Sequence, residues 1–195
     1  MRHAAPFGSC TYAVRAPVPY AVSIAMRYHE SMYPDWYAKV SAPFRSAMGV
    51  EAIRLIDKAL VVLIALVYVA AAAFMAFTGD MRLIRLLVVP AIVLIAVSIV
   101  RSALNAPRPY ELYDIDPIIQ KSTRGKSFPS RHVACAVVIA CALMWIHADW
   151  GVITFIGALG LAFTRIVGGV HFPRDVVAAA VFALVVALIG FVLVP

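Results

Sequence analysis

Charged residues are scarce in this chain. They make up 14% of its 195 residues, against 64% that are hydrophobic, and the mean hydropathy is +0.92. In soluble domains about half of the residues are apolar and about a quarter are charged. The shortage of charge therefore excludes an ordinary soluble domain and indicates a membrane protein. Because no soluble domain remains to hold nucleic acid, the net charge of +7 favours anionic lipid as the partner.

Two other features are absent or rare. Residues 1–20 contain three prolines and no continuous apolar core, so we expect no cleavable signal peptide there. Cysteine occurs only three times. Cys135 and Cys141 lie six residues apart, on different faces of one expected helix, which disfavours a disulfide between them. We expect both to be small apolar packing residues.

Five stretches have the apolarity of transmembrane helices. Two of them carry no charge over roughly the 20 residues that a spanning helix needs, and three shorter ones reach that length with flanking residues. These stretches are 59–77, 86–100, 133–146, 150–164 and 176–195. The sequence therefore predicts an all-α integral membrane bundle with about five transmembrane helices.

The N-terminal region differs from the rest, because it mixes aromatic residues with charges of both signs. An apolar helical face there is formed by Val40, Phe44, Met48 and Leu55. Pro43 suits the start of a helix. We expect residues 1–57 to form an interfacial, amphipathic helical region that leads into a transmembrane domain of residues 58–195.

Most ionisable residues are expected on one side of the membrane. With five spans, the loop 105–129 and the turn 165–174 fall on the same side. The N-terminal region falls on this side too, and the span ends and loops there carry Arg101, Arg108, Lys121, Arg124, Lys126, Arg131, His132, Arg165, His171, Arg174 and Asp175. A single arginine at the end of a span is usually a topology residue. Arginine, histidine and aspartate from three segments instead predict an anion site, and the guanidinium fork fits phosphate well.

Three motifs carry the chemistry. They are Arg101-x6-Arg108-Pro109, Pro129-Ser130-Arg131-His132 and Thr164-Arg165-x5-His171-x3-Asp175. In order and spacing they resemble the type 2 phosphatidic acid phosphatase superfamily, whose pattern is Lys-x6-Arg-Pro, Pro-Ser-Gly-His and Ser-Arg-x5-His-x3-Asp. This superfamily includes bacterial polyprenyl-diphosphate and phosphatidylglycerophosphate phosphatases. The resemblance covers about residues 59–195 and implies that residues 58–195 form a transmembrane phosphatase domain.

The chain departs from the family pattern at three positions. Arg101 replaces lysine and keeps the charge, and Thr164 replaces serine and keeps the hydroxyl. Arg131 replaces glycine, which is the larger change. Its side chain would either narrow the anion site or add a cation for a diphosphate.

The resemblance implies a catalytic trio. His171 would attack phosphorus as a neutral imidazole and form a phosphohistidine. Asp175, one helical turn later, would accept a hydrogen bond from the other ring nitrogen. His132 would protonate the leaving oxygen and then activate water.

The resemblance implies that Arg101, Arg108 and Arg165 bind the phosphate. Ser130 suits the N-terminal cap of the third span, where its hydroxyl and the free amides would complete the cradle, and Arg131 is an additional phosphate-binding candidate. Phosphoryl transfer gains mostly from positioning and charge stabilisation, so such a cradle needs no metal ion or other cofactor. Zinc held by His132, His171 and Asp175 is the alternative. The surrounding positive charge disfavours it.

The long loop before the second motif adds further candidates. Lys121, Arg124 and Lys126 are expected either to touch the substrate head group or to be ordinary membrane-surface charges. Asp114 and Asp116 are expected to be solvated loop residues rather than magnesium ligands.

The sequence thus predicts a membrane lipid phosphatase that hydrolyses a lipid phosphate or diphosphate, such as undecaprenyl diphosphate. Its partners would be the bilayer and an anionic phospholipid or polyprenyl phosphate substrate. A phosphatidylglycerophosphate or phosphatidic acid phosphatase, a lipid-linked phosphotransferase and a non-catalytic lipid-binding protein are the alternatives. By the resemblance we expect a bacterial plasma membrane protein with its active site facing outward, although the positive-inside rule favours the cytoplasmic side. The oligomeric state stays open.

Overall fold

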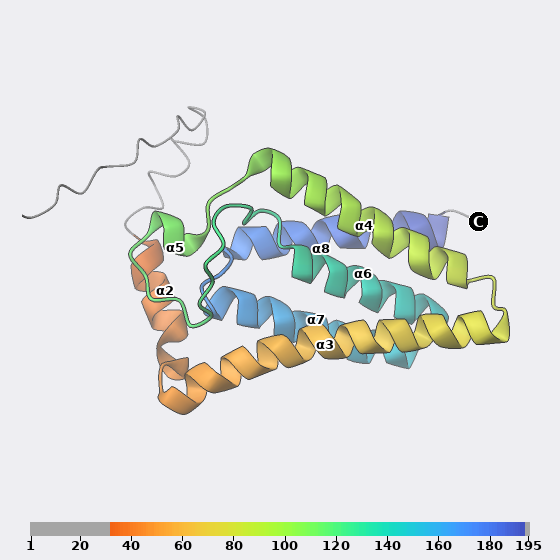
Figure 1. Cartoon of the computed structure of the whole chain (residues 1–195), viewed down its shortest axis with the longest axis horizontal. Helices are drawn as coiled ribbons and strands as arrows, with labels where there is room; N and C mark the ends of the chain where they lie inside the picture. Colours follow the sequence, from red (N-terminus) through yellow and green to blue (C-terminus); the bar gives the residue numbers. More distant parts are fainter. Residues whose placement is uncertain (1–31, 194–195) are drawn as a thin grey trace, which may run out of the picture. The chain divides into compact units, whose positions relative to one another are not determined.

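The computed structural model describes residues 32–193, and within them it contains helices and no strand (Figure 1). Residues 1–31, which hold most of the expected interfacial region and Cys10, lie outside the described residues, as do 194 and 195. The helices are α2 (Tyr33–Ser41), η1 (Ala42–Phe44), α3 (Ala47–Thr78), α4 (Leu83–Leu104), α5 (Pro109–Leu112), α6 (Arg131–Ile146), α7 (Ala148–Val167), α8 (Pro173–Leu188) and η2 (Ile189–Leu193).

The prediction of about five transmembrane helices is confirmed. By length and composition, α3, α4, α7 and α8 can each cross a membrane, and α6 is a shorter apolar helix beside them. The chain is therefore an integral membrane helical bundle. Its outward faces carry many exposed large apolar side chains, as expected of surfaces that meet lipid.

The first long helix begins upstream of the expected span 59–77 but after Pro43. Pro43 lies in the short helix η1, and α3 begins at Ala47 after Ser46. The Ser46 hydroxyl accepts a hydrogen bond from the Gly49 amide at 3.1 Å, which satisfies one free amide of the first turn. From there α3 runs unbroken to Thr78, because no glycine or proline interrupts its apolar half. The boundary expected between residues 57 and 58 therefore falls inside this helix.

The centre of the bundle is α6, which packs against α7, α8 and α4. Its buried side chains are Val133, Ala134, Ala136, Val137, Val138, Ala140, Ala142 and Leu143. Small side chains let neighbouring helices approach closely, which provides most of the association energy between helices in lipid. This packing fixes where the N-terminus of α6 meets the other helices.

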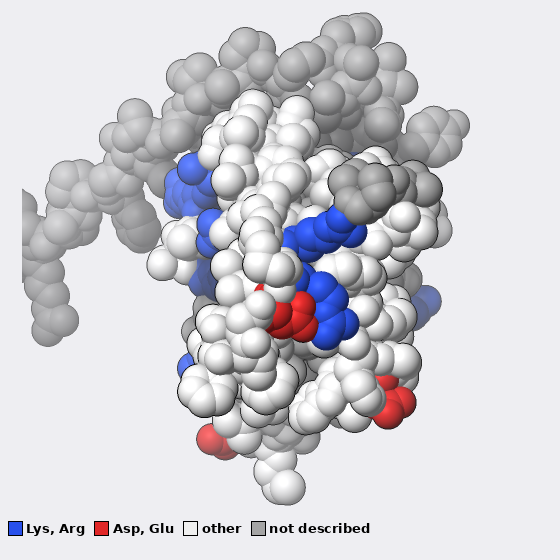
Figure 2. Space-filling model, turned by 90° about the vertical axis from the view of Figure 1, so that its right-hand side faces the viewer, with Lys and Arg blue, Asp and Glu red and all other residues white. Residues whose placement is uncertain are grey.

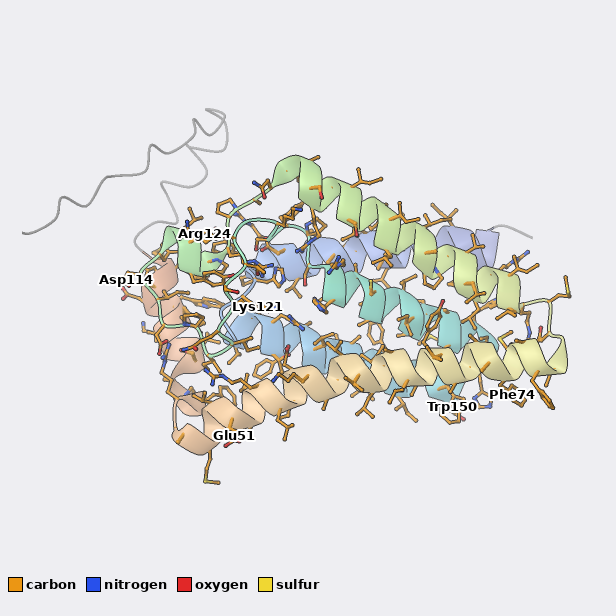
Figure 3. The ribbon with its side chains drawn as sticks, in the orientation of Figure 1. Glu51, Phe74, Asp114, Lys121, Arg124 and Trp150 are labelled. Carbon is orange, nitrogen blue, oxygen red and sulfur yellow. The ribbon has the colours of Figure 1, made fainter. Side chains whose placement is uncertain are left out.

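The loops lie at two ends of the bundle. The segment from α4 to α6 and the α7–α8 turn share one end, and the α3–α4 turn lies at the other (Figure 1). Lys121 and Arg124 lie at the first end, whereas Phe74 and Trp150 lie near the second (Figure 3). A view onto the second end shows few charged side chains on a largely uncharged surface (Figure 2). The expected gathering of charge at one end is thus present.

Helix α2 braces the charged end. The Tyr37 hydroxyl donates to the carbonyl of Val167 at 3.1 Å and accepts from the amide of Ile118 at 3.3 Å. These bonds join α2 to the end of α7 and to the long loop. Part of the N-terminal third therefore supports the region that the sequence motifs occupy.

Candidate active site

His171 lies in the turn between α7 and α8 and is almost completely buried, with 2% of its surface exposed. The turn is tight because Gly169 adopts a left-handed conformation with φ of 73°. The amides of Val170 and His171 both point to the carbonyl of Arg165, at 3.3 Å. Helix α8 then begins at Pro173, so the last span starts just after His171.

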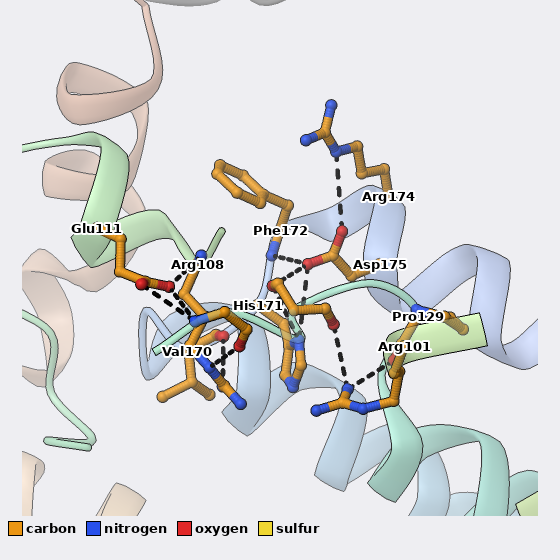
Figure 4. Close-up of polar contacts among 11 residues, drawn as sticks. Arg101, Arg108, Glu111, Pro129, Val170, His171, Phe172, Arg174 and Asp175 are labelled. Atoms are coloured by element: carbon orange, nitrogen blue, oxygen red, sulfur yellow. Dashed lines mark hydrogen bonds and ion pairs between the residues drawn. The ribbon is translucent and has the colours of Figure 1, made fainter. Parts of the chain in front are cut away.

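Asp175 lies in the first turn of α8 and faces His171. Its Oδ2 accepts hydrogen bonds from the Ser127 hydroxyl at 2.5 Å and from the Phe172 amide at 3.2 Å (Figure 4). The His171 Nδ1 is 3.6 Å from the same oxygen, too far for a good hydrogen bond. The direct bond expected between these two side chains is therefore not formed in this structure.

The Ser127 hydroxyl lies beside both side chains. Its Oγ lies 3.4 Å from His171 Nδ1 while it donates to Asp175. Ser127 was not among the predicted site residues, because a serine in a long loop carries no spacing signal that links it to positions more than forty residues away. Its position just before the Pro129–His132 motif was the only available hint.

The environment of His171 keeps its imidazole neutral. Burial lowers the pKa of His171 to about 4, and the charges of Arg108 and Arg101 act in the same direction, while Asp175 opposes them. At neutral pH the ring therefore carries no charge, and the nitrogen lone pair that a nucleophile needs is available.

His132 is the second residue of α6 and is half-buried. Ser130 precedes the helix at the capping position, but its side chain makes no capping hydrogen bond, contrary to expectation. The Ser130 amide instead donates to the carbonyl of Asp175 at 3.0 Å, which joins α6 to α8. The buried Ser130 hydroxyl has no hydrogen-bond partner among the described residues.

Arg101 and Arg108 lie on the two sides of the His171 ring (Figure 4). Arg101 Nη1 donates to the carbonyls of Pro129 at 2.7 Å and Ser127 at 3.3 Å. Arg108 donates through Nε to Gly125 and through Nη1 to Val170, at 3.1 and 3.3 Å. Both arginines thus hold the long loop against the site, and each guanidinium has five donors, so further N–H groups remain.

Arg165, the third arginine, is 3% exposed in the last turn of α7. Its Nε lies 2.9 Å from Asp57 Oδ1 of α3, an ion pair whose N–H is not aligned as a hydrogen bond. Its Nη1 has no hydrogen-bond partner among residues 32–193. We call Arg101, Arg108 and Arg165 the arginine cluster.

The three motifs expected from the sequence therefore meet at one end of the bundle. A family model described as the PAP2 superfamily matches residues 82–195, more than half of the chain. The chain belongs to the PAP2 superfamily. It is a membrane protein of this lipid phosphatase family, as the motifs predicted.

Two solved structures resemble this PAP2 protein. LpxE from Aquifex aeolicus is 25% identical, with a TM-score of 0.54 over 75% of this chain and 96% of that chain. A transmembrane PAP2-type phosphatidylglycerolphosphate phosphatase from Bacillus subtilis is 19% identical, with a TM-score of 0.63 over 87% of this chain and 89% of that chain. The second likeness concerns the fold alone. No curated protein matches the chain in sequence.

The cations outside the cluster differ in placement. Lys121 is half-buried, and burial together with Arg165, Arg108 and Arg101 lowers its pKa to about 8. Arg124 and Lys126 are exposed, and so is Arg131 at the start of α6. Among the three loop cations, Lys121 is therefore the one that lies close to the arginine cluster.

The acidic side chains of the loop are exposed. Asp114 is solvated, and Asp116 pairs with Arg45 at 3.1 Å, as expected of surface residues. Within residues 32–193, no three or more histidine, cysteine, aspartate or glutamate side chains are arranged to hold a metal ion.

Proposed function

We propose that this PAP2 protein hydrolyses a lipid phosphate or diphosphate, such as undecaprenyl diphosphate, through a phosphohistidine on His171. The observation that carries the proposal is a buried, neutral imidazole flanked by Arg101 and Arg108 at the end of a transmembrane bundle. Burying an arginine without a negatively charged partner is costly, so the arginines beside His171 support an anionic ligand.

The first step is attack on phosphorus. Nδ1 of His171 faces Ser127 and Asp175, which leaves Nε2 as the attacking atom. A bond forms from Nε2 to phosphorus, the bond from phosphorus to the leaving oxygen breaks, and His132 gives that oxygen its proton. Asp175 stabilises the positive charge that develops on the ring of His171.

The second step releases phosphate. Water attacks the phosphohistidine while His132 takes a proton from it, the bond from phosphorus to Nε2 breaks, and inorganic phosphate leaves. The arginine cluster holds the equatorial oxygens in both steps, and the unpartnered Ser130 hydroxyl supplies one more donor. No metal ion takes part.

An apolar groove supports a lipid as the substrate. It has a volume of about 210 Å³ and runs between α4 and α8 beside the site. Its lining residues are Val97, Val100, Phe128, Pro129, Ala178 and Phe182. Pro129 also accepts the hydrogen bond from Arg101, so an apolar surface adjoins the arginine cluster directly. A chain in this groove would place its phosphate among the arginines.

Two cations favour a diphosphate over a monophosphate. Lys121 lies close to the arginine cluster, and Arg131 replaces the family glycine at the start of α6. Phosphatidylglycerophosphate, the substrate class in the name of the Bacillus relative, and phosphatidic acid are the alternatives. A lipid-linked phosphotransferase would use the same phosphohistidine with another alcohol in place of water. We place the protein in a bacterial plasma membrane with this site facing outward.

The test uses purified protein and a panel of lipid phosphates and diphosphates. We expect phosphate release that falls by at least about a thousandfold in His171→Gln, because the nucleophile is lost. His147→Gln, which changes an exposed histidine between α6 and α7, is the matched control and should retain release. Full release by the His171 variant would contradict the mechanism. Loss of release with EDTA would contradict metal independence.

The intermediate can be trapped directly. With a radiolabelled phosphate ester that has a good leaving group, attack no longer needs an acid, but release still needs a base. We therefore expect His132→Ala to accumulate an acid-labile phosphoryl group that His171→Gln never acquires. Adding short alcohols distinguishes a phosphotransferase, which would form new phosphate esters.

A further inference from the structure

Asp57 is a buried carboxylate in α3, with 6% of its surface exposed. It lies outside residues 82–195, which match the family model. A charged side chain in a transmembrane helix is costly unless a partner offsets the lost hydration. Its contacts therefore indicate what it does.

One oxygen of Asp57 contacts two consecutive residues of α7. Oδ1 lies 2.9 Å from Arg165 Nε, and the Thr164 hydroxyl donates to the same oxygen at 2.9 Å. These two residues are the first pair of the motif that ends in His171 and Asp175. Asp57 thus holds the Nε side of the Arg165 guanidinium. It does so from a helix that carries none of the three motifs.

A second nitrogen of the Arg165 guanidinium, Nη1, is left for another ligand. It is buried and makes no hydrogen bond to any residue between 32 and 193. A buried donor without a partner is costly, and an anion bound at this end of the bundle would satisfy it. The Arg165 charge also acts on His132 and on Lys121, so the guanidinium lies close to the proposed reaction site.

Asp57 also offsets repulsion among the cations. Arg165 and Arg108 repel each other, and the negative charge of Asp57 acts on both Arg165 and Lys121. Without that charge, a flexible arginine would turn away from its neighbours toward solvent. The carboxylate therefore keeps Arg165 in place before any phosphate binds.

We infer that Asp57 is a positioning residue, which holds the Arg165 guanidinium so that its remaining donors meet an oxygen of the transferring phosphate. The inference rests on the proposed function for its role in turnover. The claim that Asp57 sets the affinity of Arg165 for an anion concerns binding alone and does not depend on turnover.

The test is Asp57→Asn, which keeps the shape of the side chain and removes its charge. We expect kcat/KM for the lipid substrate to fall by about 10- to 100-fold, as when residues that orient active-site ligands are changed in other enzymes. The inhibition constants of orthovanadate and inorganic phosphate should rise together with it. Glu51→Gln is the matched control, because Glu51 is an exposed carboxylate of the same helix (Figure 3).

A double-mutant cycle separates positioning from a structural role. If Asp57 acts through Arg165, then Asp57→Asn should add less than about a twofold loss in an Arg165→Gln background, since coupled residues are not additive. Thr164→Val removes the hydroxyl that donates to Asp57 but leaves the ion pair. It should lower kcat/KM by less than Asp57→Asn does, and this loss should likewise nearly vanish in the Arg165→Gln background. This second variant serves if Asp57→Asn does not fold.

Three results would overturn the inference. They are independent losses from Asp57 and Arg165, unchanged vanadate and phosphate inhibition in Asp57→Asn, or a loss that merely follows a lower melting temperature. If the unaltered protein releases no phosphate from any lipid, the proposed function fails instead. Calorimetric binding of orthovanadate to the unaltered protein and to Asp57→Asn would then still decide the role of Asp57.

Discussion

A serine hydroxyl lies beside the two side chains that were expected to form a histidine–aspartate pair. Oδ2 of Asp175 accepts from both Ser127 and the Phe172 amide, so the carboxylate is held without help from the imidazole. Ser127 in turn lies 3.4 Å from His171 Nδ1. The orientation of the ring therefore depends on a loop residue as well as on Asp175.

Replacing Ser127 with alanine should lower kcat by about tenfold or more, because a hydrogen bond to a charged group typically contributes roughly 1.5–3 kcal/mol. Initial rates of phosphate release measure the effect. Ser122→Ala removes an exposed hydroxyl from the same loop and should leave kcat unchanged. Equal rates in both variants would show that Ser127 does not position the pair.

The titration of His171 is the second prediction at this scale. Burial disfavours the charged ring, so its pKa of about 4 lies below the ordinary value of roughly 6.5. The ¹⁵N shifts of labelled imidazole, assigned with His171→Gln, should show a midpoint near 4. Asp175→Asn should lower it further, because Asp175 raises this pKa. A midpoint at or above 6.5 would refute the neutral, desolvated ring.

The same shift has a consequence for stability. Between about pH 4 and pH 6.5 the unfolded chain binds a proton at this histidine that the folded protein does not bind. This group therefore makes the folded state less stable as the pH falls through that window. Above pH 6.5 the ring is neutral in both the folded and the unfolded chain, so this loss of folding stability disappears.

At the scale of elements, the α7–α8 turn determines where His171 lies. Gly169 has a φ of 73°, and a Cβ there would lie 2.7 Å from the Tyr37 hydroxyl oxygen. Tyr37 is itself bonded to Val167 and Ile118, so it cannot easily yield. Helix α2 therefore limits the turn from outside while α7 and α8 define its ends.

Gly169→Ala should destabilise the protein by about 1–3 kcal/mol, because alanine is strained at positive φ and its Cβ meets Tyr37. Gly157→Ala in α7 is the control. Its Cβ would meet only Ile64 and Leu60 at 3.8 Å, and alanine favours a helix. Thermal unfolding in one detergent should separate the two variants. Equal melting temperatures would contradict this account.

At the scale of the whole bundle, the loops at the two ends differ in charge. The candidate site, with its cations, occupies the end formed by the α4–α6 segment and the α7–α8 turn (Figure 4). The positive-inside rule would place such an end in the cytoplasm. The number of basic residues in a substrate site depends on the charge of the substrate, so these residues are a poor guide to membrane topology.

Single cysteines can determine the orientation. In a background with the native cysteines replaced, we expect Ser122→Cys to react with a membrane-impermeant maleimide in intact cells. Met81→Cys, in the exposed α3–α4 turn, should react only after permeabilisation. The reverse pattern would place the site in the cytoplasm, and labelling of both positions in intact cells would contradict the spanning bundle.

Much of this protein follows from its sequence, because hydrophobicity and local spacing act over short distances. Apolar runs predict spans, and His171 and Asp175 lie one helical turn apart whatever the rest of the fold does. The tertiary structure alone decided the contacts between distant segments. Asp57 reaches Arg165 across 108 positions and Tyr37 reaches Val167 across 130, because helix packing brings α3 and α2 beside the end of α7. No periodicity in the chain encodes such pairs, since they depend on how side chains of whole helices fit together.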